Sequence, residues 1–356
     1  MSVEFKIGRR MVGDSHATYF VADIAANHDG DIERAKDLIH ACAEAGGNAA
    51  KFQNFQATTL VSDMGFRALG KQQTHQSTWK KSVFEIYDDA AIPLEWARIL
   101  KQTCDDAGID YFTSLYDTTM LQTLSPYVCA WKVGSGDITW HDEIERLASD
   151  GKPLLIATGA SDMHEVSAAV DAAQRHTTQI VLMQCNTNYS GSADNFAYIE
   201  LNVLKTYARQ FPDVVLGLSD HTPGHTTVLG AVALGARVVE KHFTDDSSRE
   251  GSDHPFSMDP PAWRKMVERT RELEAALGGE EKHIMENERE TIIVQRRALR
   301  ATRTLPVGTV LSSADLTALR PCPIDALPPY RLEALVGKIT VRTIKDGACV
   351  HIEDVK

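Results

Sequence analysis

Short apolar runs alternate with amphipathic stretches along most of the chain. Residues 19–24 form the first apolar run, and residues 32–45 follow with small and apolar side chains on one face, which predicts a strand and then a helix. Seven further strand-like runs follow, at 48–53, 110–114, 129–134, 153–157, 179–185, 214–219 and 237–243. Helical patterns lie between most of them, at 94–107, 117–124, 163–175, 198–210 and 224–236.

Alternation of this kind predicts an α/β fold with a parallel sheet and its helices outside. Eight strands and a last helix at 260–277 favour a (β/α)8 TIM barrel at residues 1–280. A doubly wound open sheet is the alternative, and the lack of a GxGxxG motif after the first strand weighs against it. The polar segment 57–92 is predicted to be an irregular loop, and so long a loop in a compact domain is usually functional.

The end of the chain has a different pattern. The stretch GGEEKHIMENERE is charged and poor in apolar residues, so we predict a linker at 281–290. Short β-like pieces and five prolines follow it. We therefore expect a small, mostly β domain at residues 291–356.

The composition is that of an ordinary globular protein, with 43% hydrophobic and 24% charged residues. The net charge of −12 argues against a nucleic-acid or anionic-membrane partner, and it means that an anionic substrate needs a locally basic pocket. No apolar run approaches the ~20 residues of a membrane span, and no secretory signal is evident, so we expect a cytoplasmic protein. The six cysteines are scattered and are expected to be free thiols.

Polar side chains gather at the C-terminal ends of the predicted strands, where chemistry collects in a barrel of this type. Lys51 and Lys132 lie in apolar strands, where an unpaired ammonium group is costly. Each can be paired with a carboxylate such as Asp23 or Asp137. Alternatively, both lysines face a phosphate or carboxylate ligand, with hydroxyl groups and backbone N–H donors around it. Because two lysines lie beside four strand ends that carry hydroxyls, we favour the anion site.

His221 and His242 stand at the ends of two consecutive strands, 21 positions apart in the sequence. Neighbouring parallel strands lie ~4.8 Å apart, so both imidazoles can share one divalent cation. An ordinary hydrogen-bonded role is the alternative for each ring. With two nitrogen ligands, water and substrate oxygens would complete the coordination, which suits a Lewis acid that polarises a carbonyl group.

Several motifs, taken together and in order, resemble the sialic acid (N-acetylneuraminate) synthases, the phosphoenolpyruvate-dependent nonulosonic acid synthases of bacteria. They are NHDGDIERAKDLI, KFQ, WKVGSGD, ATGASDMHEV, GLSDHT, EKHFTDD and GSDHPFSM. The C-terminal stretches TLPVGTVLSSADLTALRP and LVGKITVRTIKDGACV resemble the small antifreeze-like (SAF) domain of these enzymes. The resemblance covers nearly the whole chain.

The resemblance implies a condensation of phosphoenolpyruvate with an N-acylated hexosamine, N-acetylmannosamine or a deoxy diamino relative, to give a nonulosonic acid and phosphate. It also implies a divalent cation held by His221 and His242, Mn²⁺ with Mg²⁺ or Co²⁺ as alternatives. Finally, it implies a domain-swapped homodimer, in which Arg320 of the small domain reaches the sugar site of the other subunit.

The resemblance also assigns roles to individual residues. Those implied for catalysis are Asp23, Lys51, Lys132, His221 and His242. Those implied for phosphoenolpyruvate are Lys51, Ser114, Lys132, Ser135, Thr158, Asn186, Thr187 and Ser219. Those implied for the sugar are Gln53, Asp137, Tyr189, Asp253 and Arg320.

The chain departs from the family at some of these places. Asp23 and Asp137 stand where the family usually has glutamate, which shortens each side chain by about 1.5 Å. The change indicates an altered sugar or a shifted water, with neutral drift as the alternative. Ser114-Leu115 replaces a threonine-proline pair, and residues 63–82 match no family pattern and are a candidate substrate lid.

Two other functions stay open on the sequence alone. A related phosphoenolpyruvate-dependent synthase could act on another aldose, although Gln53, Asp137 and Tyr189 suit a neutral sugar better than a sugar phosphate. A non-catalytic carbohydrate-binding protein, in which both aspartates mark lost chemistry, is the second alternative.

Overall fold

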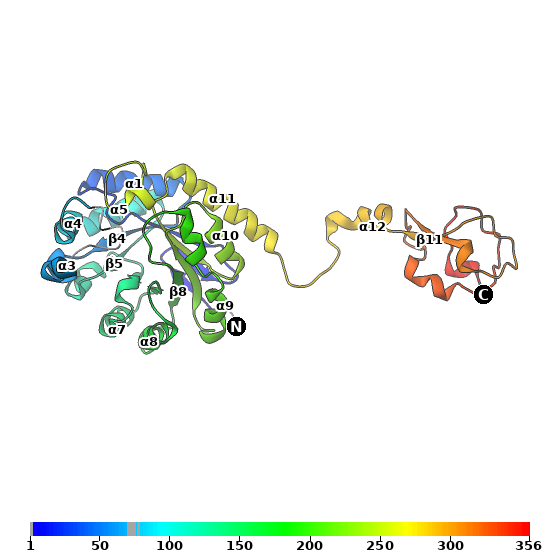
Figure 1. Cartoon of the computed structure of the whole chain (residues 1–356), viewed down its shortest axis with the longest axis horizontal. Coiled ribbons are helices and arrows are strands. Elements are labelled where there is room, and N and C mark those ends of the chain that lie inside the picture. Colours follow the sequence, from blue (N-terminus) through cyan, green and yellow to red (C-terminus); the bar gives the residue numbers. More distant parts are fainter. Residues whose placement is uncertain (1–2, 70–75, 77–78) are drawn as a thin grey trace. The chain divides into compact units, whose positions relative to one another are not determined.

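The computed structural model describes residues 3–69, 76 and 79–356, and the chain divides into two compact units, Met1–Gly278 and Gly279–Lys356. The first unit contains a closed barrel of eight parallel strands in the order β10-β3-β4-β5-β6-β7-β8-β9 (Figure 1). The barrel strands are β3 (Tyr19–Asp23), β4 (Ala49–Asn54), β5 (Asp110–Leu115), β6 (Trp131–Val133), β7 (Leu154–Ala157), β8 (Ile180–Cys185), β9 (Val215–Asp220) and β10 (Val238–His242). The predicted TIM barrel is confirmed, and the open sheet is excluded because β10 pairs with both β9 and β3.

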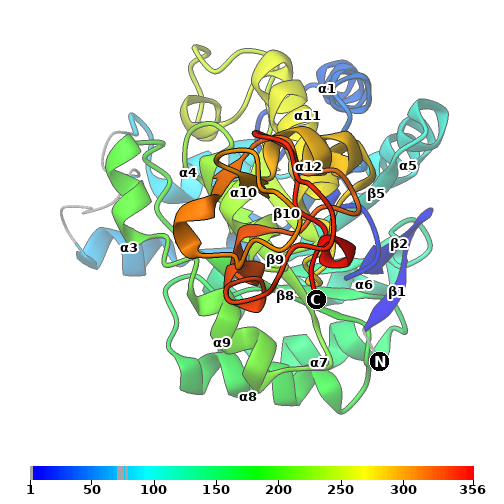
Figure 2. The same ribbon diagram turned by 90° about the vertical axis from the view of Figure 1, so that its right-hand side faces the viewer.

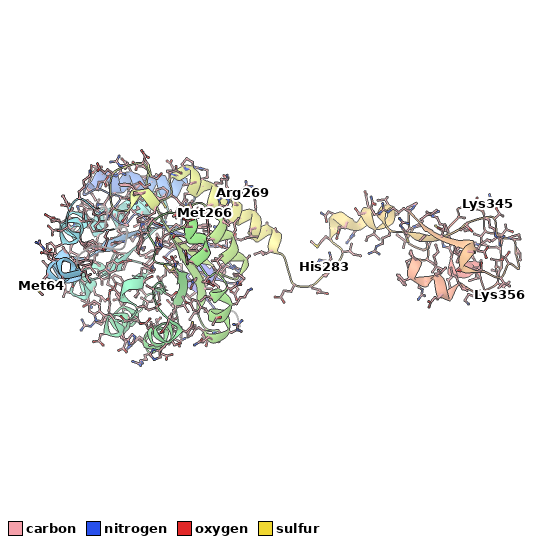
Figure 3. The ribbon with its side chains drawn as sticks, in the orientation of Figure 1. Met64, Met266, Arg269, His283, Lys345 and Lys356 are labelled. Carbon is pink, nitrogen blue, oxygen red and sulfur yellow. The ribbon has the colours of Figure 1, made fainter. Side chains whose placement is uncertain are left out.

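Helices surround the barrel and pack their apolar faces on it. In α11, Met266 is fully buried, whereas Arg269, labelled near it in Figure 3, is exposed. Among the described residues, no helix combines the length and apolar character needed to cross a membrane. The main helices outside the 57–92 segment are α1 (Ile32–Glu44), α5 (Trp96–Ala107), α6 (Leu121–Leu124), α7 (His141–Ser149), α8 (Met163–Gln174), α9 (Val203–Gln210), α10 (Thr226–Ala233) and α11 (Pro260–Leu277).

The segment 57–92, predicted to be an irregular loop, contains helices, so that prediction was wrong. The helices described there are α2 (Ala57–Leu60), α3 (Asp63–Leu69) and α4 (Val83–Ala90). The longest has eight residues, too few to repeat the apolar period that marks a helix in a sequence. Part of the candidate lid, residues 70–75 and 77–78, lies outside the described residues.

A hairpin of β1 (Glu4–Ile7) and β2 (Arg10–Gly13) precedes the barrel and is dark blue in Figure 2. The backbone N–H of Arg9, in the turn, donates to Asp110, the first residue of β5. Arg237, directly before β10, donates to the loop that follows β2. The hairpin therefore covers the N-terminal ends of the strands and leaves their C-terminal ends open.

The second unit has an apolar core of its own. In it β11 (Ala298–Ala301) pairs with β12 (Leu316–Leu319) in the antiparallel sense, and α12 (Arg289–Gln295) precedes them. The expected small, mostly β domain is confirmed. Its buried apolar side chains are Leu299, Ala301, Leu305, Leu311, Leu316, Leu335, Ile344, Val350 and Val355.

Candidate active site

A cavity of about 290 Å³ lies at the C-terminal ends of the barrel strands. The strands themselves contribute Asp23, Lys51, Gln53, Ser114, Lys132, Ala157, Cys185, Ser219, Glu240 and His242 to its wall. Segments beyond the strand ends contribute most of the rest, including Phe55, Leu60, Trp79, Ile86, Tyr87, Tyr116, Ser135, Asp137, Thr187, Tyr189, His221 and Asp253.

Two lysines and two carboxylates form one buried cluster in this wall. Lys51 Nζ lies 2.7 Å from Asp23 Oδ2, and it donates to Ser114 Oγ at 3.1 Å. Lys132 Nζ lies 2.9 Å from Glu240 Oε1. The same Glu240 oxygen is 3.6 Å from Lys51 Nζ, so Glu240 bridges the two ammonium groups. The charged side chains are at most 5% exposed.

The two positive and two negative groups balance in sign, and burial raises the pKa of Asp23 although Lys51 acts to lower it. Burial acts to raise the pKa of Glu240, but Lys132 and Lys51 outweigh it and lower that pKa to about 2. Burial likewise acts to lower the pKa of Lys51, but Asp23 and Glu240 raise it above the ordinary value. Of the two carboxylates considered from the sequence, Asp23 pairs with Lys51. The partner of Lys132 is Glu240 and not Asp137.

His221 and His242 lie next to each other in the cavity wall, with ring centroids 5.4 Å apart. His221 Nδ1 lies 3.0 Å from the carbonyl oxygen of Asn186, which can only accept, so Nδ1 carries a hydrogen. Burial acts to lower the pKa of His221, but Cys185 and the Asn186 carbonyl raise it above the ordinary value. Burial lowers the pKa of His242 to about 3, so this ring is neutral at neutral pH. Within the described part of the chain, His242 Nδ1 has no hydrogen-bond partner, and no cluster of three or more His, Cys, Asp or Glu has metal-site geometry.

Aromatic rings hold the two imidazoles in place. The Tyr189 ring centroid is 4.4 Å from that of His221, and the Phe256 centroid is 4.8 Å from that of His242. Tyr189 and Phe256 also contact each other, at 5.3 Å. Both contacts are edge-on, and they restrict the rotation of the two imidazoles.

The hydroxyl groups of Ser135 and Thr187 come close to the backbone of residue 159 because that residue is a glycine. Ser135 Oγ accepts from the backbone N–H of Gly159 at 3.0 Å. A Cβ at Gly159 would lie 1.8 Å from Thr187 Oγ1 and 2.9 Å from Ser135 Oγ, so glycine is required for this approach. Ser219 Oγ donates to Glu240 on the other side of the cluster, at 3.3 Å.

Most residues predicted for the site line this one cavity. They are Asp23, Lys51, Gln53, Ser114, Lys132, Ser135, Asp137, Thr187, Tyr189, Ser219, His221, His242 and Asp253. The structure thus brings together side chains from all but one of the eight predicted strand ends, together with Asp253 from the loop after β10.

Thr158 and Asn186 are not in the cavity wall, in contrast to their predicted role in binding phosphoenolpyruvate. Thr158 Oγ1 donates to the Met183 carbonyl and accepts from the Tyr207 hydroxyl, so it serves the packing of α9 on the barrel. The Asn186 side chain donates to the Tyr198 carbonyl, and its backbone carbonyl orients His221. Both residues follow a strand directly, but their side chains turn away from the barrel axis.

Arg320 belongs to the second unit, where its Nε donates to the Gln295 carbonyl at 2.6 Å. This bond connects the residue to the end of α12.

Sequence reasoning missed several residues of the wall. Glu240 could have been predicted to point into the site, because it lies two positions before His242 and strand side chains alternate between faces. Ile86 and Tyr87 were missed because their segment was interpreted as an irregular loop, whereas Trp79 lies in the candidate lid at residues 63–82.

Comparison with known proteins decides the family. The NeuB family matches residues 38–282, and the SAF domain matches residues 296–356. The chain belongs to the NeuB family.

This NeuB-family chain is 32% identical to the N,N'-diacetyllegionaminic acid synthase of Legionella pneumophila, over 96% of both sequences. It is 29% identical to the human N-acetylneuraminate-9-phosphate synthase, over 97% of this chain and 94% of that protein. Among solved structures, the N-acetylneuraminic acid synthetase of Leptospira borgpetersenii in complex with citrate superimposes with a TM-score of 0.71 at 25% identity. That alignment covers 82% of this chain and 96% of the other.

Proposed function

We propose that this chain is a transferase that condenses phosphoenolpyruvate with the open-chain aldehyde of an N-acyl hexosamine, giving a nonulosonic acid and phosphate. The observation that carries the proposal is the meeting of Lys51 and Lys132 with His221 and His242 in one cavity wall. The names of the relatives, which are synthases of legionaminic and neuraminic acids, support the same reaction class.

The lysine cluster suits phosphoenolpyruvate, which carries a phosphate and a carboxylate. An ammonium group has three donors, and Lys132 uses one of them on Glu240, so donors are available for an anion. Ser135 and Thr187 add hydroxyl groups beside the same cluster. Glu240 acts as a positioning residue, because it holds both ammonium groups at fixed distances before the substrate arrives.

The histidine pair suits a divalent cation, which we infer to be Mn²⁺, with Mg²⁺ or Co²⁺ as alternatives. His221 Nε2 and the unpartnered nitrogen of buried His242 are the donors that support this inference. When bound, such a cation polarises the aldehyde carbonyl and stabilises the alkoxide that develops on it.

The reaction forms one carbon–carbon bond and releases phosphate by C–O cleavage. The methylene carbon of phosphoenolpyruvate attacks the aldehyde carbon, and the aldehyde oxygen gains a proton. Water adds at C2, and the resulting tetrahedral centre expels phosphate. Asp23 Oδ2 lies 2.7 Å from Lys51 Nζ and 3.6 Å from His242 Nε2, so it stands between the lysine cluster and the histidine pair. This position supports a role for Asp23 in accepting a proton from that water.

We further propose a domain-swapped homodimer, in which Arg320 reaches the sugar bound in the other subunit. The resemblance to the family supports this proposal, and Arg320 lies within residues 296–356, which match the SAF domain.

The proposed reaction is tested by phosphate release from phosphoenolpyruvate in the presence of Mn²⁺ and a panel of acetamido sugars, with mass spectrometry of the product. A chelator should abolish turnover, and so should the double variant His221→Ala with His242→Ala. Full turnover with the chelator present would contradict the metal. Sugar binding without phosphate release from any sugar would favour a non-catalytic carbohydrate-binding protein.

A further inference from the structure

Two of the sequence motifs meet beside the cavity. NHDGDIERAKDLI begins shortly after β3, and GSDHPFSM, residues 251–258, follows β10. Segment 251–258 contains Asp253, which lines the cavity, and Phe256, whose ring centroid is 4.8 Å from that of His242. The position of this segment therefore decides where one carboxylate of the wall stands and how one imidazole is packed.

Segment 251–258 is attached to the loop after β3. The backbone N–H of Ala26 donates to Asp253 Oδ2 at 3.1 Å, so one carboxylate oxygen is held by that loop. The Asn27 amide donates to Ser257 Oγ at 2.9 Å, and this hydroxyl donates to the Asp253 carbonyl at 2.6 Å. The side chain and the backbone of Asp253 thus both depend on where the loop lies.

His254 makes a third connection, and its side chain is fully buried. Its Nε2 lies 3.0 Å from Asp29 Oδ1, and because a carboxylate oxygen accepts, Nε2 is the donor. Its Nδ1 lies 2.7 Å from Thr244 Oγ1, in the segment that leaves β10. One imidazole therefore joins residues that are 225 positions apart, from the loop after β3 and from segment 251–258.

The backbone around this imidazole permits an unusually close approach. A Cβ at Gly251 would lie 2.5 Å from His254 Cδ2, so a side chain there would displace the ring. Asp29 has a φ of 52°, in the left-handed region that is uncommon outside glycine. Arg34 Nε lies 3.1 Å from Asp29 Oδ2 and holds the carboxylate from its other side. These features together bring the imidazole and the carboxylate into contact.

We propose that His254 is a positioning residue for the sugar side of the cavity, where its bond to Asp29 fixes segment 251–258 and so the carboxylate of Asp253. The inference rests on the proposed condensation and on the role implied there for Asp253 at the sugar. His254 itself is not part of the cavity wall. With Oδ2 held by the backbone, Asp253 is oriented before the sugar binds, which lowers the cost of binding it in a reactive position.

The phosphoenolpyruvate side of the cavity is held by other contacts. Lys51 and Lys132 are paired with Asp23 and Glu240, all of them on barrel strands. Loss of the His254 bond should therefore affect the sugar and leave phosphoenolpyruvate binding unchanged.

Two substitutions of His254 separate the bonds of its ring. His254→Gln places an amide N–H near the position of Nε2 and keeps a donor for Asp29, whereas His254→Asn reaches only toward Thr244. With the most active sugar of the acetamido panel, His254→Asn should lower kcat/KM by about 100-fold, as a misplacement of about 1 Å can. The loss should lie mainly in the sugar KM, with the KM for phosphoenolpyruvate unchanged. His254→Gln should keep most of the activity, and equal losses in both variants would overturn the inference.

A third variant removes the same bond from its other end. Asp29 is exposed, and glycine adopts a φ of 52° without strain, so Asp29→Gly should fold. It removes the acceptor for His254 Nε2 and should raise the sugar KM as His254→Asn does. An unchanged sugar KM in Asp29→Gly would contradict a role for this bond.

Tyr19→Phe is the matched control for a general loss of stability. The Tyr19 hydroxyl donates to Asp110 at 2.9 Å, a buried bond to a carboxylate at the N-terminal ends of the strands, and neither residue lines the cavity. Thermal unfolding should show losses of similar size in Tyr19→Phe and His254→Asn. The sugar KM should change only in His254→Asn, and an equal change in Tyr19→Phe would show that stability alone accounts for the effect.

Crystal structures separate this inference from the proposed reaction. In His254→Asn, or in Asp29→Gly if the former does not fold, we expect the Asp253 carboxylate to leave the Ala26 N–H. An unchanged Asp253 would overturn the inference whatever the turnover. If the parent protein releases no phosphate with any sugar but Asp253 moves in the variant, the proposed reaction fails and the positioning role of His254 stands.

Discussion

Glu240 lies between two buried ammonium groups, and this single carboxylate links the cavity wall to the stability of the barrel. Lys132 and Lys51 keep it ionised, with its pKa lowered to about 2 against the effect of burial. Removing one partner of a buried ion pair leaves an uncompensated charge, which is strongly destabilising. Changes at these residues therefore have to be judged on stability and on substrate binding together.

Lys132→Met should raise the KM for phosphoenolpyruvate by about 10- to 100-fold, because hydrogen bonds to charged groups contribute about 1.5–3 kcal/mol. The sugar KM should change little. Lys241→Met is the matched control, since Lys241 is equally buried but pairs with Asp220 outside the cavity. Steady-state kinetics and thermal unfolding of both variants check this. A change in the sugar KM alone would show that the cavity is divided differently between the substrates.

Glu143 is a buried carboxyl group that has no hydrogen-bond partner for either oxygen among the described residues. Burial, and then the charges of Asp137 and Asp117, raise its pKa from 4.5 to about 8. The folded protein thus retains a proton that the unfolded chain releases, so stability falls as the pH rises from about 5 to about 8.

Glu143→Gln should therefore match the parent protein near pH 5 and become more stable than it by about 1–3 kcal/mol at pH 8, the usual cost of a buried unsatisfied polar group. Urea unfolding at pH 5, 6.5 and 8 measures this. A stability difference that is the same at all three pH values would rule out the proton as its cause.

At the scale of single elements, the side chains of β10 alternate between the cavity and the outside of the barrel. Glu240 and His242 point into the cavity, whereas Lys241, between them, points to the outer layer. There Lys241 Nζ bonds to Asp220 and to the Thr222 carbonyl. One strand therefore lines the cavity with one face, and with the other it bonds to the end of β9 and the segment after it.

The short helix α4 carries Ile86, Tyr87 and Ala90, and a capping box of Ser82 and Glu85 starts it. Ser82→Ala should destabilise this helix by about 1 kcal/mol and raise the sugar KM, while the KM for phosphoenolpyruvate stays the same.

The matched control for that prediction is Asp162→Ala. Asp162 forms the same kind of capping box with Glu165 at the start of α8, which contributes nothing to the cavity wall. It should lose similar stability with no change in either KM. Kinetics and thermal unfolding of the two variants distinguish a role in the wall from a general loss of stability.

At the scale of the whole molecule, the chain carries two separate apolar cores, one in each unit. The proposed exchange of domains in a dimer makes a specific prediction about mixed dimers. Lys132→Met and Arg320→Ala should each be poorly active alone. When they are co-expressed and the mixed dimer is purified, one of its two sites has both residues intact, so about half of the normal activity should return. No recovery would contradict a contribution of Arg320 across the dimer.

Most of the barrel strands were predictable because the pattern that marks a strand lies within a few consecutive residues. Eight apolar runs with polar ends mark the strands, and the histidines and lysines stand at those ends. The helices at 57–92 were not predictable, since four to eight residues do not establish a period. The partner of Lys132 was not predictable either, because Glu240 lies 108 positions away in the sequence.

The sequence by itself determined where the strands lie along the chain and which polar residues stand at their ends. It could do so because side-chain periodicity and apolar runs are properties of neighbouring positions. Only the tertiary structure decided which of these ends meet. Closure of the barrel brings β10 back beside β3 and sets Glu240 between lysines from β4 and β6. It also turns Thr158 and Asn186 away from the cavity, since the direction of a side chain after a strand depends on the packing around it.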